Sequence, residues 1–102
     1  MKSPQTLFTA LADPTRREVF ERLSSEGPAS ATKLAASLPI SRQAIQKHLT
    51  VLDEAGLVTR STVGREVTYS AVPAALADMT AWAARVDAQW TDRLKRLRRS
   101  LG

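Results

Sequence analysis

The 102-residue sequence predicts a mainly α-helical fold with one small β-hairpin. Two patterns support this fold class. Apolar residues recur at intervals of three and four through most of the chain, which is the helical period, whereas residues 57–72 are rich in β-branched residues and alternate apolar with polar side chains. A chain of this length builds one modest core. We therefore expect a single domain over residues 1–102.

Two helices are expected before residue 28. Ser3-Pro4 is a helix-start signal for the first, which ends near Ala12. Asp13-Pro14 starts the second, because a carboxylate can cap free amide groups and proline suits the first helical position. Gly27-Pro28 ends it. The apolar edges of these helices consist of Leu7, Phe8 and Leu11 and of Val19, Phe20 and Leu23.

A very tight turn is expected between the third and fourth helices. The third begins at Ser30 or Thr32 and ends at Pro39, and Ser41 opens the fourth, which continues to Leu52. This spacing is typical of a helix-turn-helix unit.

The fourth helix is amphipathic in a way that suits DNA. Ile45, Leu49 and Leu52 form its apolar stripe, and the opposite surface carries Arg42, Gln43, Gln46, Lys47 and Thr50. Arg and Lys donate to guanine O6 and N7, and Gln both donates to and accepts from adenine. The pattern therefore predicts a helix that reads bases in the major groove, although the same polar surface alone is also compatible with a solvated helix face.

The hairpin is expected directly after this helix. Its strands are residues 57–63 and 66–72, and Gly64-Arg65 forms a basic turn at the tip. Five helices with a hairpin after the fourth correspond to a winged helix-turn-helix, with a DNA-binding core over residues 3–72. Arg65 can be an ordinary turn residue, but an arginine on a wing also suits the narrow minor groove.

One long helix is expected over residues 73–101. Its apolar stripe consists of Leu76, Met79, Ala83, Val86, Trp90, Leu94, Leu97 and Leu101. At about 1.5 Å per residue, such a helix is on the order of 40 Å long, more than a domain of this size can cover. The stripe therefore predicts a dimerisation helix. Trp82 and Trp90 can line an effector pocket at the dimer seam, but aromatic residues on such a stripe are more often packing residues.

The net charge of +5 lies entirely in the last ten residues. Residues 1–92 carry ten basic and ten acidic side chains, whereas the tail has no acid and contains Arg93, Lys95, Arg96, Arg98 and Arg99. Cationic amphipathic helices of this kind occur in dimers, at membrane surfaces and against anionic partners. We favour a dimer helix over membrane contact.

Several functions are excluded by residue types. The sequence has no cysteine and one histidine, whereas a zinc or copper site needs three or four N or S ligands. It has no nucleophile motif and no glycine-rich phosphate loop. We expect no enzymatic activity, no cofactor and no metal. The chain also has no signal-peptide pattern or long apolar run, so we expect a cytoplasmic protein without a membrane partner.

Three stretches resemble the ArsR/SmtB family of bacterial repressors: LADPTRREVFERL (11–23), LAASLPISRQAIQKHLTVLDEAGLV (34–58) and GREVTYSA (64–71). The resemblance implies a homodimeric, DNA-binding transcriptional repressor that packs through its first and last helices and occupies a palindromic operator. By position, it implies DNA contacts from Ser41, Arg42, Gln43, Gln46, Lys47 and Arg65. It implies a dimer interface containing Leu7, Phe8, Leu11, Trp82, Val86, Trp90 and Leu94.

The sequence departs from the metal-sensing members of this family. Many of them use cysteines at the start of the third helix or histidine and carboxylate ligands on the last helix. Here the matching positions of the third helix are Ser30, Thr32 and Ala35, and the last helix has no histidine. The resemblance therefore implies a metal-ligand-free branch, and it does not identify a small-molecule effector. The alternative is a winged-helix interaction module whose basic C-terminal helix binds an acidic protein.

His48 and two arginines have structural interpretations beside their functional ones. His48 lies at the border of the apolar stripe, which favours a neutral ring with an internal hydrogen bond over a phosphate contact. Arg16 and Arg17 have the reach to contact a DNA backbone, but we interpret both as structural because Glu21 follows Arg17 by four residues.

Overall fold

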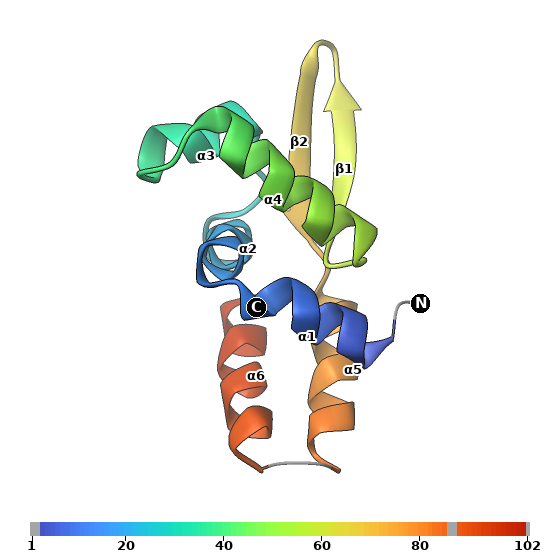
Figure 1. Ribbon diagram of the computed structural model, residues 1–102. Coiled ribbons are helices and arrows are strands. Elements are labelled where there is room, and N and C mark those ends of the chain that lie inside the picture. The colour runs from blue at the N-terminus through green and yellow to red at the C-terminus, as the bar shows by residue number, and fades with distance from the viewer. Residues whose placement is uncertain (1–2, 86–87, 102) are drawn as a thin grey trace.

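The computed structural model describes residues 3–85 and 88–101, which form six helices and one antiparallel hairpin (Figure 1). The helices are α1 (Pro4–Ala12), α2 (Pro14–Glu26), α3 (Ala31–Ser37), α4 (Arg42–Glu54), α5 (Pro73–Ala83) and α6 (Ala88–Ser100). The strands are β1 (Val58–Val63) and β2 (Glu66–Ala71). The predicted fold class is confirmed, with six helices in the described residues instead of five.

The first four helices each begin at a side-chain cap. The cap oxygens accept hydrogen bonds from backbone N–H groups three residues later, and the cap residues are Ser3, Asp13, Ser30 and Ser41. Such caps stabilise helices by about 1 kcal/mol each because they satisfy amides that the helix itself leaves unpaired. Ser30 is therefore the start of the third helix, and Thr32 lies in its first turn.

The turn between α3 and α4 is as short as predicted. It comprises only residues 38–41, and the N–H of Leu38 still donates to the carbonyl of Leu34, 3.1 Å away. On α4, Ile45, Leu49 and Leu52 have no exposed surface. The turn and this buried stripe together fix which face of α4 points outward.

The hairpin projects beyond α3 and α4 at the top of Figure 1. Its strands pair from Val58 opposite Ala71 to Val63 opposite Glu66. Gly64 has φ of 63° in the two-residue turn, a conformation that glycine adopts without steric cost. At the base, Ala29 and Tyr69 exchange two backbone hydrogen bonds of 2.9 and 3.1 Å. An isolated two-stranded hairpin is only marginally stable in water. These two bonds stabilise the wing because they join it to the helical body.

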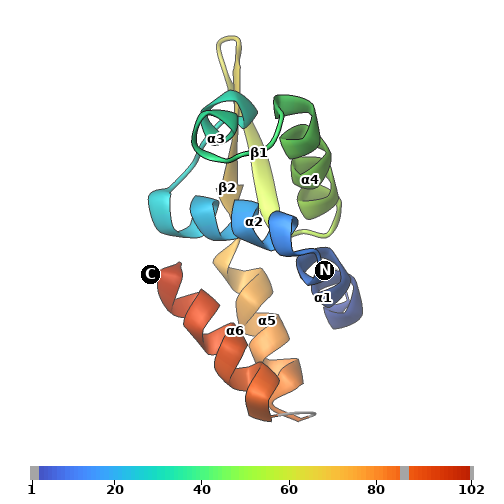
Figure 2. The same ribbon diagram turned by 60° about the vertical axis from the view of Figure 1, so that its left-hand side comes forward.

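The core runs on both sides of α2. Figure 2 shows α2 between two groups of elements, with α3, α4 and the hairpin on one side and α5 and α6 on the other. Val19 and Phe20 of α2 are completely buried, as are Leu76 and Met79 of α5. The molecule is consequently elongated, with extents of 43 × 25 × 23 Å.

The single helix predicted over residues 73–101 is wrong. The structure has α5 up to Ala83, and α6 runs back beside it (Figures 1 and 2). Because α5 and α6 pack side by side, one chain covers much of the apolar stripe of residues 73–101 by itself. Leu94 of α6, for example, is only 2% exposed. The length of the stripe therefore does not require a second chain to cover it. In the described residues, no helix has the length and apolar character to cross a membrane.

Candidate nucleic-acid interface

The outer face of α4 is accessible, as its sequence predicts. Ser41, Arg42, Gln43 and Lys47 are all exposed on the side opposite the buried stripe. Ser41 also caps the helix, because its Oγ accepts the N–H of Ala44 at 3.1 Å. The N-terminal end of such a helix favours anions, so the cap position and a phosphate contact are compatible.

Gln46 lies differently from the other predicted DNA contacts. It is half-buried, and its Nε2 donates to the hydroxyl of Tyr69, 3.0 Å away. The amide retains one further N–H and its carbonyl oxygen for other partners. The side chain is therefore held toward the wing, whereas Gln43 and Lys47 are more exposed.

Tyr69 joins three parts of the fold, and sequence analysis did not identify it as a functional residue. It is 4% exposed on β2, its backbone pairs with Ala29 before α3, and its hydroxyl accepts from Gln46 on α4. Because a buried tyrosine hydroxyl usually has a hydrogen-bond partner, a tyrosine on the apolar face of the wing was the signal available in the sequence.

A cationic groove separates the wing from the helix-turn-helix. It has a volume of about 680 Å³ and is lined by three arginines, Arg42, Arg60 and Arg65. Arg42 is oriented by a 3.2 Å hydrogen bond from its Nε to Oγ1 of Thr32 on α3. Glu66 is the one acid among the described lining residues. Arg60 was missed by sequence analysis, which considered only the turn of the hairpin.

The tip of the wing is both basic and apolar. Arg65 is exposed in the turn, and Val63 immediately before the turn is 74% exposed. The tip therefore offers an arginine and a hydrocarbon surface where the hairpin projects beyond α3 and α4 (Figure 1).

Comparison with known proteins places this arrangement in a family. Residues 11–61 match the model of a helix-turn-helix domain family. The HTH-type transcriptional regulator Rv2034 of Mycobacterium tuberculosis is 43% identical over 76 residues, which is 74% of this chain and 70% of the relative. A solved ArsR-like transcriptional regulator from Rhodococcus sp. RHA1 is 41% identical with a TM-score of 0.76, covering 94% of this chain and 90% of that one.

The chain belongs to the ArsR family of winged helix-turn-helix regulators. The arsenical resistance operon repressor of Escherichia coli is also similar, at 35% identity over 85% of this chain and 72% of the relative. The chain is thus a DNA-binding transcriptional regulator, as its sequence predicts.

Cysteine ligands of the kind that many ArsR-family metal sensors use are missing from this sequence. The full sequence has no cysteine. In residues 3–85 and 88–101, no three side chains of His, Asp or Glu lie close enough together to hold a metal ion.

The predicted dimer residues of this ArsR-family chain divide into three groups. Leu7, Leu11 and Leu94 are 2–6% exposed in a single chain, so they form core and offer little surface to a partner. Phe8 and Trp82 are half-buried, and their rings pack against each other at a centroid distance of 5.1 Å. Val86 and the side chain of Trp90 lie outside the described residues.

The junction of α1 and α2 with α4 contains the remaining polar residues of interest. Nη1 of Arg16 donates to the carbonyl of Ala10 at 3.1 Å, which supports its structural interpretation. Nδ1 of His48 is buried and has no hydrogen-bond partner in the described part of the chain, so the expected internal bond is not found at that atom. The backbone N–H of Arg16, with help from the charge of His48, lowers the pKa of Asp13.

Proposed function

We propose that this ArsR-family regulator is a homodimeric repressor that places α4 in the major groove of an inverted-repeat operator. The observation that carries the proposal is the three-arginine groove directly beside the exposed face of α4. A cationic concavity next to a polar helix suits a DNA strand whose phosphates enter the groove while its bases meet the helix. The Escherichia coli relative is named a repressor, and this supports repression over activation.

The contacts divide by chemistry. Arg42, Arg60 and Arg65 line the groove and suit phosphate oxygens or the adjacent minor groove. Gln43 and Lys47 project from the exposed face of α4 and suit base edges. Gln46 keeps one donor and one acceptor for DNA while its bond to Tyr69 fixes its direction.

The dimer contact in this proposal involves the partly exposed Phe8 and Trp82 on α1 and α5. A symmetric dimer presents two α4 helices about one turn of DNA apart, so the operator is an inverted repeat. The proposal includes no catalytic step and no metal response, since thiolate ligands are missing from the sequence.

The DNA contacts are tested with the DNA upstream of the chain's own gene. Gln43→Ala and Lys47→Ala should each weaken operator binding by about 1–3 kcal/mol, because each removes contacts to one base position per half-site. Fluorescence anisotropy with operator and random duplexes measures the ratio of the affinity for the operator to the affinity for random DNA. Gln5→Ala on the exposed side of α1 is the matched control. An unchanged ratio in both α4 variants excludes α4 as the reader.

Assembly is tested separately. Phe8→Glu combined with Trp82→Glu should give monomers in sedimentation velocity, because two charges replace the apolar surface left open on each chain. Operator affinity should fall with the loss of the second half-site. A wild-type monomer at micromolar concentration contradicts the dimer.

A further inference from the structure

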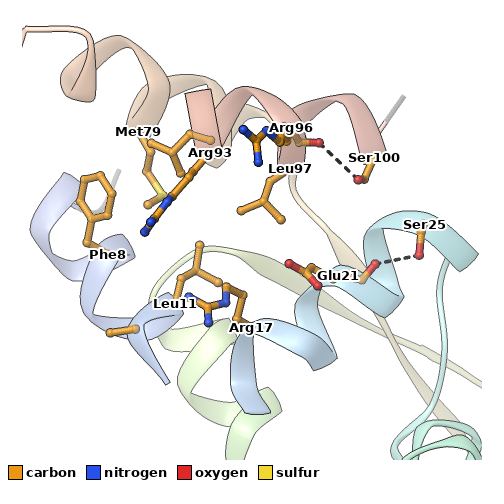
Figure 3. Close-up of a pocket in the computed structure, with 12 residues that line it drawn as sticks. Phe8, Leu11, Arg17, Glu21, Ser25, Met79, Arg93, Arg96, Leu97 and Ser100 are labelled. Atoms are coloured by element: carbon orange, nitrogen blue, oxygen red, sulfur yellow. Dashed lines mark hydrogen bonds between the residues drawn. The ribbon is translucent and has the colours of Figure 1, made fainter. Parts of the chain in front are cut away.

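A second pocket lies away from the DNA-binding groove. It has a volume of about 590 Å³, and its lining residues come from α1, α2, α5 and α6, with none from α3, α4 or the hairpin (Figure 3). This size is typical of small-molecule sites. None of these residues belongs to the proposed DNA contacts, although Phe8 also belongs to the proposed dimer contact.

The floor of this pocket is apolar. It is formed by side chains from three helices, including Leu11 at 6% exposure, Met79 at 0% and Leu94 at 2%. Phe8 and Leu97 are half-buried beside them. A hydrocarbon group of a ligand would therefore bury surface against a floor that is already in place.

The rim of the same pocket is cationic. Arg17 comes from α2, Arg93 and Arg96 come from α6, and Glu21 is the one acid among the described lining residues. In Figure 3, Arg93 extends from α6 across the pocket toward α1, while Arg17 lies on the α2 side below Leu11. Three guanidinium groups against one carboxylate give the described lining a positive net charge, which attracts an anion.

We propose that this pocket binds a small amphipathic carboxylate. The carboxylate accepts hydrogen bonds from the guanidinium groups of Arg17 and Arg93, and the hydrocarbon chain lies on the floor formed by Leu11, Met79 and Leu97. Guanidinium groups suit this ligand because their planar donors match both oxygens of a carboxylate.

A second copy of the chain fits the pocket less well. A two-fold contact centred on this pocket would appose the same patch of both chains, so the arginines of one rim would come near those of the other. Juxtaposed like charges oppose association. The charge of the rim therefore favours an anionic ligand inside the pocket, and the proposed dimer contact shares only Phe8 with the described lining residues.

Isothermal titration calorimetry with octanoate tests the proposal without DNA, so its outcome is independent of the proposed operator binding. We expect saturable binding of one octanoate per chain. 1-Octanol has the same hydrocarbon chain without the charge and should bind at least about tenfold more weakly. Equal affinity for both probes, or no saturable octanoate binding at millimolar concentration, overturns the proposal.

Substitutions locate the site. Arg17→Gln and Arg93→Gln should each weaken octanoate binding by about tenfold, the effect of losing a charge-assisted hydrogen bond. Glu21→Gln should tighten it, because an acid is removed from the rim. Arg98→Gln, on the same helix as Arg93 but outside the pocket, is the matched control and should leave affinity unchanged.

The variants also separate the ligand site from a subunit contact. Glu21 and Arg93 are exposed, so their variants keep the test valid if Arg17→Gln fails to fold. If Arg93→Gln binds octanoate as wild type does, or if it changes the sedimentation coefficient without changing octanoate affinity, the pocket is not the carboxylate site.

Discussion

At the scale of single residues, Asp13 links the fold to pH. Its Oδ1 accepts the N–H of Arg16 at 2.9 Å, which is the main reason that its pKa is lowered, and the charge of His48 acts in the same direction. A lowered pKa means that folding favours the ionised carboxylate. Its stabilisation is therefore complete above about pH 5 and is lost as pH falls through the ordinary aspartate value near 4 and below.

Asp13→Asn tests this link. Asparagine caps helices about as well as aspartate but does not ionise, so the variant should lose less thermal stability than wild type between about pH 5 and pH 3. Thermal melts followed by circular dichroism across this range measure the difference. Parallel curves for the two proteins would show that another group controls acid stability.

Residue types predicted the outward positions on α4 but not how each side chain is held. Arg42, Gln43, Gln46 and Lys47 share a polar face in the sequence, yet Arg42 bonds to Thr32 and Gln46 bonds to Tyr69. These partners are 10 and 23 residues away along the chain. Helical periodicity places a side chain on a face, and only the packing of other elements decides what it contacts there.

At the scale of elements, the wing and α4 are coupled through Tyr69. Tyr69→Phe keeps the buried ring and removes the hydroxyl that accepts from Gln46. The loss should cost about 0.5–1.5 kcal/mol of stability, since the amide can partly turn to water. Operator affinity should also fall, because both Gln46 and the wing lose a fixed orientation. Urea denaturation and anisotropy measure the two effects.

Thr62→Val is the control for this prediction. Thr62 is exposed on β1, so its variant also removes a hydroxyl from the wing but leaves the contact with α4 intact. A loss of affinity in Thr62→Val equal to that in Tyr69→Phe would mean that the wing, and not its coupling to α4, is responsible.

Helix starts were predictable from sequence, but the break between α5 and α6 was not. Ser, Asp and Pro at the starts of α1 to α4 act within one turn, so their meaning is local. The apolar spacing of α5 and α6 has the same period in one long helix as in two short ones. Asp87, of a residue type favoured just before a helix, directly precedes Ala88 in the sequence and was the signal available.

At the scale of the whole molecule, the break changes where the charge lies. A single long helix would carry the basic tail far from α2, whereas α6 returns toward it, and Ser100 lines a pocket together with Ser25 (Figure 1). The cations of residues 93–102 therefore lie beside the helical body. They remain distinct from the groove at the wing, which contains Arg42, Arg60 and Arg65.

The two cationic regions should have separable effects on DNA binding. Phosphate attraction sets sequence-independent affinity and its salt dependence, whereas contacts at base edges set selectivity. Changing Lys95, Arg98 and Arg99 together to Gln removes three exposed charges outside both pockets and leaves the buried Leu94 in place. We expect operator and random DNA to weaken by similar factors at low salt, with their ratio nearly intact and a slower association rate.

The charge-retaining variant sharpens this prediction. Arg98→Lys with Arg99→Lys keeps the charge but removes the guanidinium fork, so it should bind as wild type does if attraction is purely electrostatic. Anisotropy and stopped-flow association between about 50 and 200 mM salt give both affinity and rate. Selective loss of the operator in the Gln variant would assign the tail to specific contacts. No change at low salt would remove the tail from DNA binding and leave an acidic protein as its better partner.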